Sequence, residues 1–144
     1  MLELKSLVIL KPDALHRNLF DLFVKQLKAN GLEIDEYRYI KSPDATKINE
    51  HYEEYVNEDW YSKLFIYMHS GPIIVMAVKP ILKNYLASSG DIIDFNDETS
   101  VNYIRKFALT FRQMHKINFT YNTIHSSDSI ESAERELKIW GLYP

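Results

Sequence analysis

Two short apolar runs, each followed by a Lys-Pro pair, constrain the fold of this chain most strongly. Residues 4–10 precede Lys11-Pro12, and residues 73–78, the most apolar stretch of the sequence, precede Lys79-Pro80. Short runs rich in β-forming residues predict buried strands, and proline ends such a strand because it lacks a backbone donor. We therefore predict a buried strand at each run, and the second is best placed at the centre of a sheet.

Helical periodicity fills most of the chain between and after these strands. Apolar positions at helical spacing predict a helix over residues 18–30, with Gly31 as its left-handed C-terminal cap. Residues 32–41 alternate in polarity, which predicts a half-exposed strand. The remaining predicted elements are helices over residues 42–56, 59–69 and 129–140, a short helix over 81–87, one or two helical turns over 101–110 and a short strand over 121–125. Residues 88–98 and 112–120 are predicted to be irregular.

Strands that alternate with helices, in too few units for a doubly wound sheet, favour an α+β fold. We predict a ferredoxin-like sandwich of the split β-α-β kind. The length of 144 residues predicts a single domain over residues 1–144, with an insertion at about 88–102.

Composition excludes several chemistries. The four glycines lie too far apart for GxGxxG or GxxxxGK[ST], so neither a Rossmann fingerprint nor a Walker A loop is present. Without cysteine the chain has no disulfide, thiolate metal site or cysteine nucleophile. A net charge of -3 disfavours non-specific binding to nucleic acid. The N-terminal segment carries a glutamate, Glu3, where a signal peptide has a basic region, and no apolar stretch approaches about 20 residues. These features predict a soluble, cytoplasmic protein without a membrane partner.

His125 is the strongest candidate for a nucleophile. It closes a predicted strand, and Glu136 follows on the third turn of the next predicted helix. A carboxylate there can reach one imidazole nitrogen and fix the tautomer that leaves the other free to attack, and a phosphorylated imidazole is a reasonable intermediate. A hydrogen-bonded structural histidine gives the same pattern, so spacing alone leaves both interpretations open.

Other candidate residues are equally ambiguous one at a time. Lys11 at a strand end, Arg105 and Arg112 can each bind phosphate or remain solvated surface charges. Trp60 belongs to an aromatic cluster that suits either core packing or stacking on a base. The spacing of His51 and Glu54 resembles that of a metal-ligand pair, but no second pair accompanies it, so we predict no protein metal site.

The joint order of these residues resembles the nucleoside diphosphate kinase family. The segments that carry the resemblance are residues 6–14 (SLVILKPDA), His51-Tyr52, residues 67–72 (YMHSGP) and residues 122–136 (NTIHSSDSIESAERE). The last is the most specific, since it is similar to the family's asparagine, x, x, histidine, glycine, serine, aspartate, serine signature. The resemblance covers residues 4–80 and about 110–140.

This resemblance implies a fold, an activity and a set of roles. The fold is a four-stranded, mainly antiparallel sheet covered by helices. The activity is transfer of the γ-phosphate from a nucleoside triphosphate to a nucleoside diphosphate through phosphorylated His125, with Glu136 orienting the ring and Lys11 as the third catalytic residue. Magnesium is expected on the nucleotide phosphates, and the protein is expected to form a homo-oligomer. The implied nucleotide-binding residues are Lys11, Tyr52, Trp60, Arg105, Thr110, Arg112, Asn122 and Ser127.

The sequence also departs from the family pattern. Ser126 replaces the glycine after the histidine, and the arginine loop, residues 108–114, retains Thr110 and Arg112 but no glycine. The family's second arginine and threonine have no secure counterpart, and Arg105 and Thr99 are the candidates. Two alternatives therefore accompany the kinase: a catalytically weakened nucleotide-binding homologue, and a regulatory or protein-interaction module of the same fold.

Overall fold

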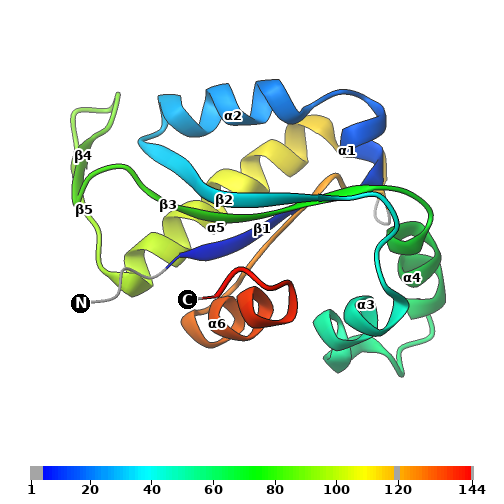
Figure 1. The fold of residues 1–144 in the computed structure, drawn as a ribbon. Helices are drawn as coiled ribbons and strands as arrows, with labels where there is room; N and C mark the ends of the chain where they lie inside the picture. The colour runs from blue at the N-terminus through cyan, green and yellow to red at the C-terminus, as the bar shows by residue number, and fades with distance from the viewer. Residues whose placement is uncertain (1–4, 119–120, 144) are drawn as a thin grey trace.

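The computed structural model describes residues 5–118 and 121–143 of the chain. Figure 1 shows a central sheet with helices on both of its faces. In chain order the elements are β1 (Ser6–Leu10), α1 (Pro12–His16), α2 (Phe20–Ala29), β2 (Leu32–Ile40), α3 (Ala45–His51), η1 (Glu53–Tyr55), α4 (Tyr61–His69), β3 (Ile73–Pro80), β4 (Asn84–Leu86), β5 (Ile92–Asp94), α5 (Asp97–His115), β6 (Ile124–Ser126) and α6 (Ile130–Ile139).

The main sheet has four strands in the order β2-β3-β1-β6, and every neighbouring pair is antiparallel. β3 thus lies between β1 and β2, so the first β-α-β unit is split by an inserted strand, as the ferredoxin-like fold requires. The predicted α+β class and split topology are confirmed. β1 and β3 are buried along nearly their whole length, which explains why their sequences are continuously apolar.

Alternate residues of β1 supply two separate cores. Leu7 and Ile9 belong to a cluster under α3, α4 and α6, whereas Val8 and Leu10 belong to a cluster under α2 and α5. The two faces follow from the period of two along a strand. Ile9 lies opposite His125 on β6, and side chains directly opposite each other share a face of a sheet. His125 therefore faces the layer of α3, α4 and α6.

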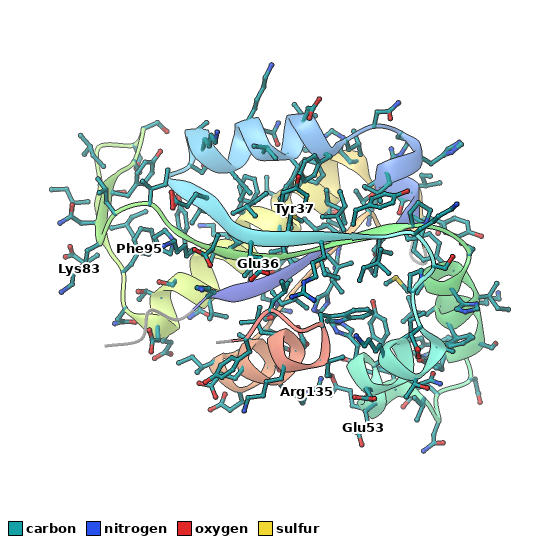
Figure 2. All side chains as sticks on the ribbon, in the orientation of Figure 1. Glu36, Tyr37, Glu53, Lys83, Phe95 and Arg135 are labelled. Carbon is teal, nitrogen blue, oxygen red and sulfur yellow. The ribbon has the colours of Figure 1, made fainter. Side chains whose placement is uncertain are left out.

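The segment after β3 differs from its prediction. The prediction of a short helix over residues 81–87 was wrong, because β4 lies in that segment and pairs with β5 as a hairpin. The ring of Tyr85 packs on Gly31 so closely that a Cβ at Gly31 would lie 2.5 Å from it, and the Tyr85 hydroxyl donates to the Ala29 carbonyl at 2.8 Å. Lys83 and Phe95 lie at the end of the molecule where the hairpin projects (Figure 2). This long-range packing has no local sequence signal.

Helix α5 is also longer than predicted. It includes the region expected to be irregular up to His115, and its first turn falls inside the segment 88–102 that was predicted as an insertion. Asn96 and Thr99 form a reciprocal capping box at its start. Its buried positions recur at helical spacing: Val101, Ile104, Ala108 and Phe111. Arg112 consequently lies in the last turn of a regular helix.

Two further boundaries differ. Pro12 begins a short helix, α1, rather than only ending the strand, since proline is favourable at a first helical position. The last strand was predicted over residues 121–125 and spans Ile124–Ser126 instead. Within the described part of the chain, no helix is both long and apolar enough to cross a membrane.

Candidate active site

A pocket of about 250 Å³ opens beside His125, between the α3–α4 region and the C-terminal half of α5. It collects side chains from distant parts of the chain. The predicted residues that line it are Lys11, Tyr52, Trp60, Arg105, Arg112, Asn122, His125 and Glu136. Ser126 also lines it.

His125 is fixed by a buried carboxylate. Its Nε2 lies 2.8 Å from Glu136 Oε1, and the Ser127 hydroxyl donates to the same oxygen at 2.8 Å. A carboxylate only accepts hydrogen bonds, so the proton of a neutral His125 is assigned to Nε2 and the lone pair to Nδ1. Burial lowers the pKa of His125 to about 3, and the charges of Lys11 and Arg112 act in the same direction. The imidazole is therefore neutral, as a nucleophile must be.

The carboxylate itself sits in a buried network. Burial raises the pKa of Glu136, while the hydrogen bond from Ser127 opposes that rise. Ser127 is fully buried, and its hydroxyl also accepts from the Leu7 amide at 3.2 Å, which anchors it to β1. Ser127 thus lies behind Glu136 and outside the pocket lining, in a position to orient the carboxylate.

His51 packs against His125 with ring centroids 4.4 Å apart and planes at 78°. Its Nδ1 accepts from the Trp140 indole at 3.1 Å, and Nε2 is buried without a hydrogen-bond partner among the described residues. Burial holds the pKa of His51 well below its usual range, so this ring is neutral too. Sequence reasoning considered His51 only as a metal ligand and as part of a motif, and its role as a neighbour of His125 had no local signal.

Three ligand atoms, from His51, His125 and Glu136, lie within 4.8 Å of one another. Two imidazoles and one carboxylate resemble zinc ligands, whereas magnesium prefers oxygen donors. Glu136 Oε1 already accepts two hydrogen bonds in this cluster. The cluster therefore does not fit a magnesium ion held by the protein. Carboxylates elsewhere in the pocket come from Glu54 and Asp128. Sequence reasoning considered Glu54 only as a metal-ligand partner of His51 and gave Asp128 no role in the site.

Cations line the pocket near His125. Lys11 is 3% exposed, and its ammonium donates to Asn122 Oδ1 at 2.6 Å. The pKa of Lys11 is lowered to about 7, mainly by burial and in addition by the charge of Arg112. The Arg112 guanidinium donates from Nε at 3.2 Å and from Nη2 at 2.6 Å to the Ile124 carbonyl. Arg105 lies two turns earlier on α5 and is exposed. Such a set of cations suits the oxygens of phosphate groups.

Aromatic side chains form another part of the pocket. Trp60 is 41% exposed, and its ring centroid lies 5.3 Å from that of Tyr55. Tyr52 is buried, and its hydroxyl has no hydrogen-bond partner in the described structure. Burial raises the pKa of Tyr52, so the phenol keeps its proton and can donate to a ligand. The pocket thus offers an exposed ring for stacking and an unused donor.

Besides Ser127, two candidate residues lie away from the pocket lining. Thr110 is exposed and its hydroxyl donates to the Lys106 carbonyl at 3.0 Å, on a different side of α5 from Arg112. Thr99 is used by the capping box at the start of α5. Ser126, which stands in place of the family's glycine, is not among the residues with positive φ, so its Cβ introduces no backbone strain.

Comparison with known proteins relates this chain to a family. The family model described as nucleoside diphosphate kinase matches residues 4–141. The nucleoside diphosphate kinase of Staphylococcus epidermidis is 32% identical over 136 residues, which cover 94% of this chain and 86% of the relative. That of Thermoanaerobacter sp. (strain X514) is 33% identical over 136 residues and 94% of each chain.

Solved structures show the same fold. The nucleoside diphosphate kinase of Aquifex aeolicus has a TM-score of 0.68 at 22% identity and covers 95% of this chain and 94% of its own. That of Encephalitozoon cuniculi has a TM-score of 0.69 at 22% identity, over 94% of this chain and 87% of its own. Because the family model spans nearly the whole sequence, and curated relatives exceed 30% identity over most of both chains, this chain belongs to the nucleoside diphosphate kinase family.

Proposed function

We propose that the protein transfers the γ-phosphate of a nucleoside triphosphate to a nucleoside diphosphate through a phosphohistidine at His125. One observation carries the proposal. A neutral imidazole, with Nε2 bonded to Glu136, lines the same pocket as Lys11, Arg105 and Arg112. A nucleophile beside convergent cations is the arrangement that phosphoryl transfer needs, since positioning and charge stabilisation supply most of the acceleration.

The reaction has two half-steps. The Nδ1 lone pair of His125 attacks the γ-phosphorus, the bond from that phosphorus to the β-γ bridging oxygen breaks, and its electron pair leaves with the nucleoside diphosphate. A second nucleoside diphosphate then attacks the phosphohistidine through a terminal β-phosphate oxygen, and the N–P electron pair returns to Nδ1. Throughout, Nε2 keeps its proton and donates it in a hydrogen bond to the Glu136 carboxylate, which offsets the positive charge that develops on the ring. Lys11 and Arg112 neutralise the transferring oxygens.

Magnesium enters this proposal as part of the substrate, the magnesium complex of the nucleotide. Its preferred oxygen ligands are those of the phosphates. Tyr52 and Asn122 are assigned contacts with phosphate or sugar hydroxyls, and Trp60 is assigned stacking on the base. Stacking is tolerant of base identity, because every base has a π-face. We therefore propose broad nucleobase specificity.

The test is a labelling experiment. The purified protein is incubated with magnesium and ATP labelled at the γ-phosphate. We expect an acid-labile, alkali-stable phosphate on the protein, which a nucleoside diphosphate removes as labelled triphosphate. Absence of label on the wild-type protein would sink the catalytic proposal and favour a nucleotide-binding homologue. We also propose a homo-oligomer, which the family implies, and a cytoplasmic location, which rests on the sequence composition. Sedimentation velocity tests the first.

The first prediction concerns pH. The ammonium form of Lys11 binds phosphate, and its pKa in the free protein is about 7. We expect kcat/KM to fall about tenfold per pH unit above about pH 7, as this proton is lost. Bound phosphate favours the charged form, so kcat holds to higher pH. A flat kcat/KM profile to about pH 9 would contradict this role of the Lys11 ammonium.

The same pKa affects stability. Between the folded pKa of Lys11, near 7, and its unfolded value of about 10.4, the unfolded state binds more protons than the folded state. The free energy of unfolding therefore rises with pH across that window.

The second prediction separates the orientation of His125 from the charge beside it. In Glu136→Gln the amide oxygen can still accept from both His125 and Ser127, so the tautomer persists and only charge assistance is lost. We expect kcat to fall about tenfold. Glu136→Ala removes the acceptor, and we expect a loss on the order of 10²–10⁴-fold. Rapid-quench measurement of phosphohistidine formation, with a melting curve for each variant, compares the two, and equal losses would contradict control of the tautomer.

A further inference from the structure

Thr123 has an unusual backbone conformation next to the proposed nucleophile. Its φ is +80°, a region that a β-branched residue rarely adopts, and the Ile124 amide donates to the Asn122 carbonyl at 2.9 Å. A bond from residue i+2 to residue i across a residue of positive φ defines a γ-turn of the rare, strained form. Such strain persists only where surrounding contacts hold it, and it concentrates at functional sites.

The contacts that hold this turn come from Asp13 on α1. One oxygen, Oδ1, accepts from the Thr123 amide at 3.1 Å, and the other, Oδ2, accepts from the Thr123 hydroxyl at 2.8 Å. Arg17 donates to Oδ2 at 2.9 Å, to the Thr123 hydroxyl at 3.0 Å and to the His115 carbonyl. The Asp13 side chain is 7% exposed, so these charge-assisted bonds form away from water.

The turn sets the positions of groups on both sides of it. Before Thr123, Asn122 accepts from the Lys11 ammonium at 2.6 Å. After it, the Ile124 carbonyl accepts from Nε and Nη2 of Arg112. At the turn itself, the Thr123 carbonyl accepts from the Lys11 amide at 2.8 Å. Lys11 and Arg112 are therefore both hydrogen-bonded to residues of the strained turn at Thr123, and His125 follows two residues after it.

We infer that Asp13 is a positioning residue, whose carboxylate holds the Thr123 turn and thereby places Lys11 and Arg112 for the transferring phosphate. The inference rests on the proposed function, because it assigns these two cations to phosphate. Asp13 lies outside the pocket lining and touches no reacting atom. Its effect passes through the backbone, and a displacement of about 1 Å in such groups costs roughly 10²-fold in rate.

Glycine supplies the decisive test, because it adopts positive φ without strain. We expect Asp13→Asn to lower kcat/KM by roughly 10–10²-fold, since the side chain that holds the Thr123 turn loses its charge and one hydrogen-bond acceptor. Thr123→Gly alone stays within about threefold of the wild type, and in the Asp13→Asn background it recovers about tenfold. An Asp13 that only stabilises α1 through Arg17, or only tunes the charge of Lys11, gains no activity from a glycine at position 123.

A matched pair keeps the test decisive if Asp13→Asn does not fold. Thr123→Val and Thr123→Gly both remove the hydroxyl, but only valine keeps the steric cost of positive φ. We expect Thr123→Val to lose about tenfold more kcat/KM than Thr123→Gly. Equal activity in this pair, or unaltered kinetics in folded Asp13→Asn, would overturn the inference. Failure of the wild-type protein to label from ATP would instead overturn the proposed function, so the two failures are distinguishable.

Discussion

Replacing His125 with alanine abolishes the phosphoenzyme, and with it we expect kcat to fall by about 10⁴-fold or more. The variant loses the group that accepts the phosphate, while Lys11 and Arg112 remain in place to bind nucleotide. Nucleotide affinity therefore stays within about threefold of the wild type. Titration of the fluorescence of Trp60, the exposed tryptophan of the pocket, measures that affinity, and the labelling experiment measures the phosphoenzyme.

His69→Ala is the matched control for this variant. His69 is exposed at the end of α4 and stacks on Phe65, away from the pocket lining. We expect it to label like the wild type. If His125→Ala still accepts phosphate, the nucleophile lies elsewhere, and His115 at the end of α5 is the next residue to replace. Loss of label in both variants would point to a general effect of removing histidines rather than to a nucleophile at His125.

The sequence predicted the parts of the fold that depend on local pattern. The continuous apolar run of β3 and the helical spacing of α2 each reflect a burial pattern that one element generates alone. The prediction for the segment from Ile81 to Asp94 was wrong because the structure of this segment depends on distant contacts. Tyr85 packs on Gly31, more than fifty residues earlier, and no periodicity within three-residue strands reveals such a contact.

The pocket shows the same division. His125, Glu136, Lys11 and Arg112 were found through their joint order, and the structure brings all four to one pocket. Ring packing by His51 on His125 was missed, since residues 74 apart in sequence meet only through the topology of the sheet. The hydrogen bonds from Thr123 to Asp13 were missed for a related reason. Neither a positive φ at a threonine nor its contact with a distant aspartate follows from residue propensities.

Replacement of Arg112 is expected to have the second large effect on kcat, because its guanidinium makes two kinds of contact. Nε and Nη2 donate to the Ile124 carbonyl, which fixes the plane of the guanidinium. The remaining N–H donors are available to phosphate. Lysine keeps the charge but cannot satisfy the carbonyl and a phosphate from one rigid fork. We therefore expect Arg112→Lys to lower kcat by roughly 10³-fold, within the range known for arginines that stabilise phosphoryl transfer.

Arg105→Lys is the internal comparison, since both arginines lie on α5 and line the same pocket. Arg105 is exposed, so water screens its interaction with a ligand, and a lysine there preserves most of the attraction. We expect a rise in KM of less than about tenfold with kcat nearly unchanged. Steady-state kinetics on the two variants separates a group that acts in the transition state from one that only attracts the nucleotide. Equal effects on kcat would show that the bond to Ile124 does not distinguish the two arginines, and would remove the basis for placing Arg112 at the transferring phosphate.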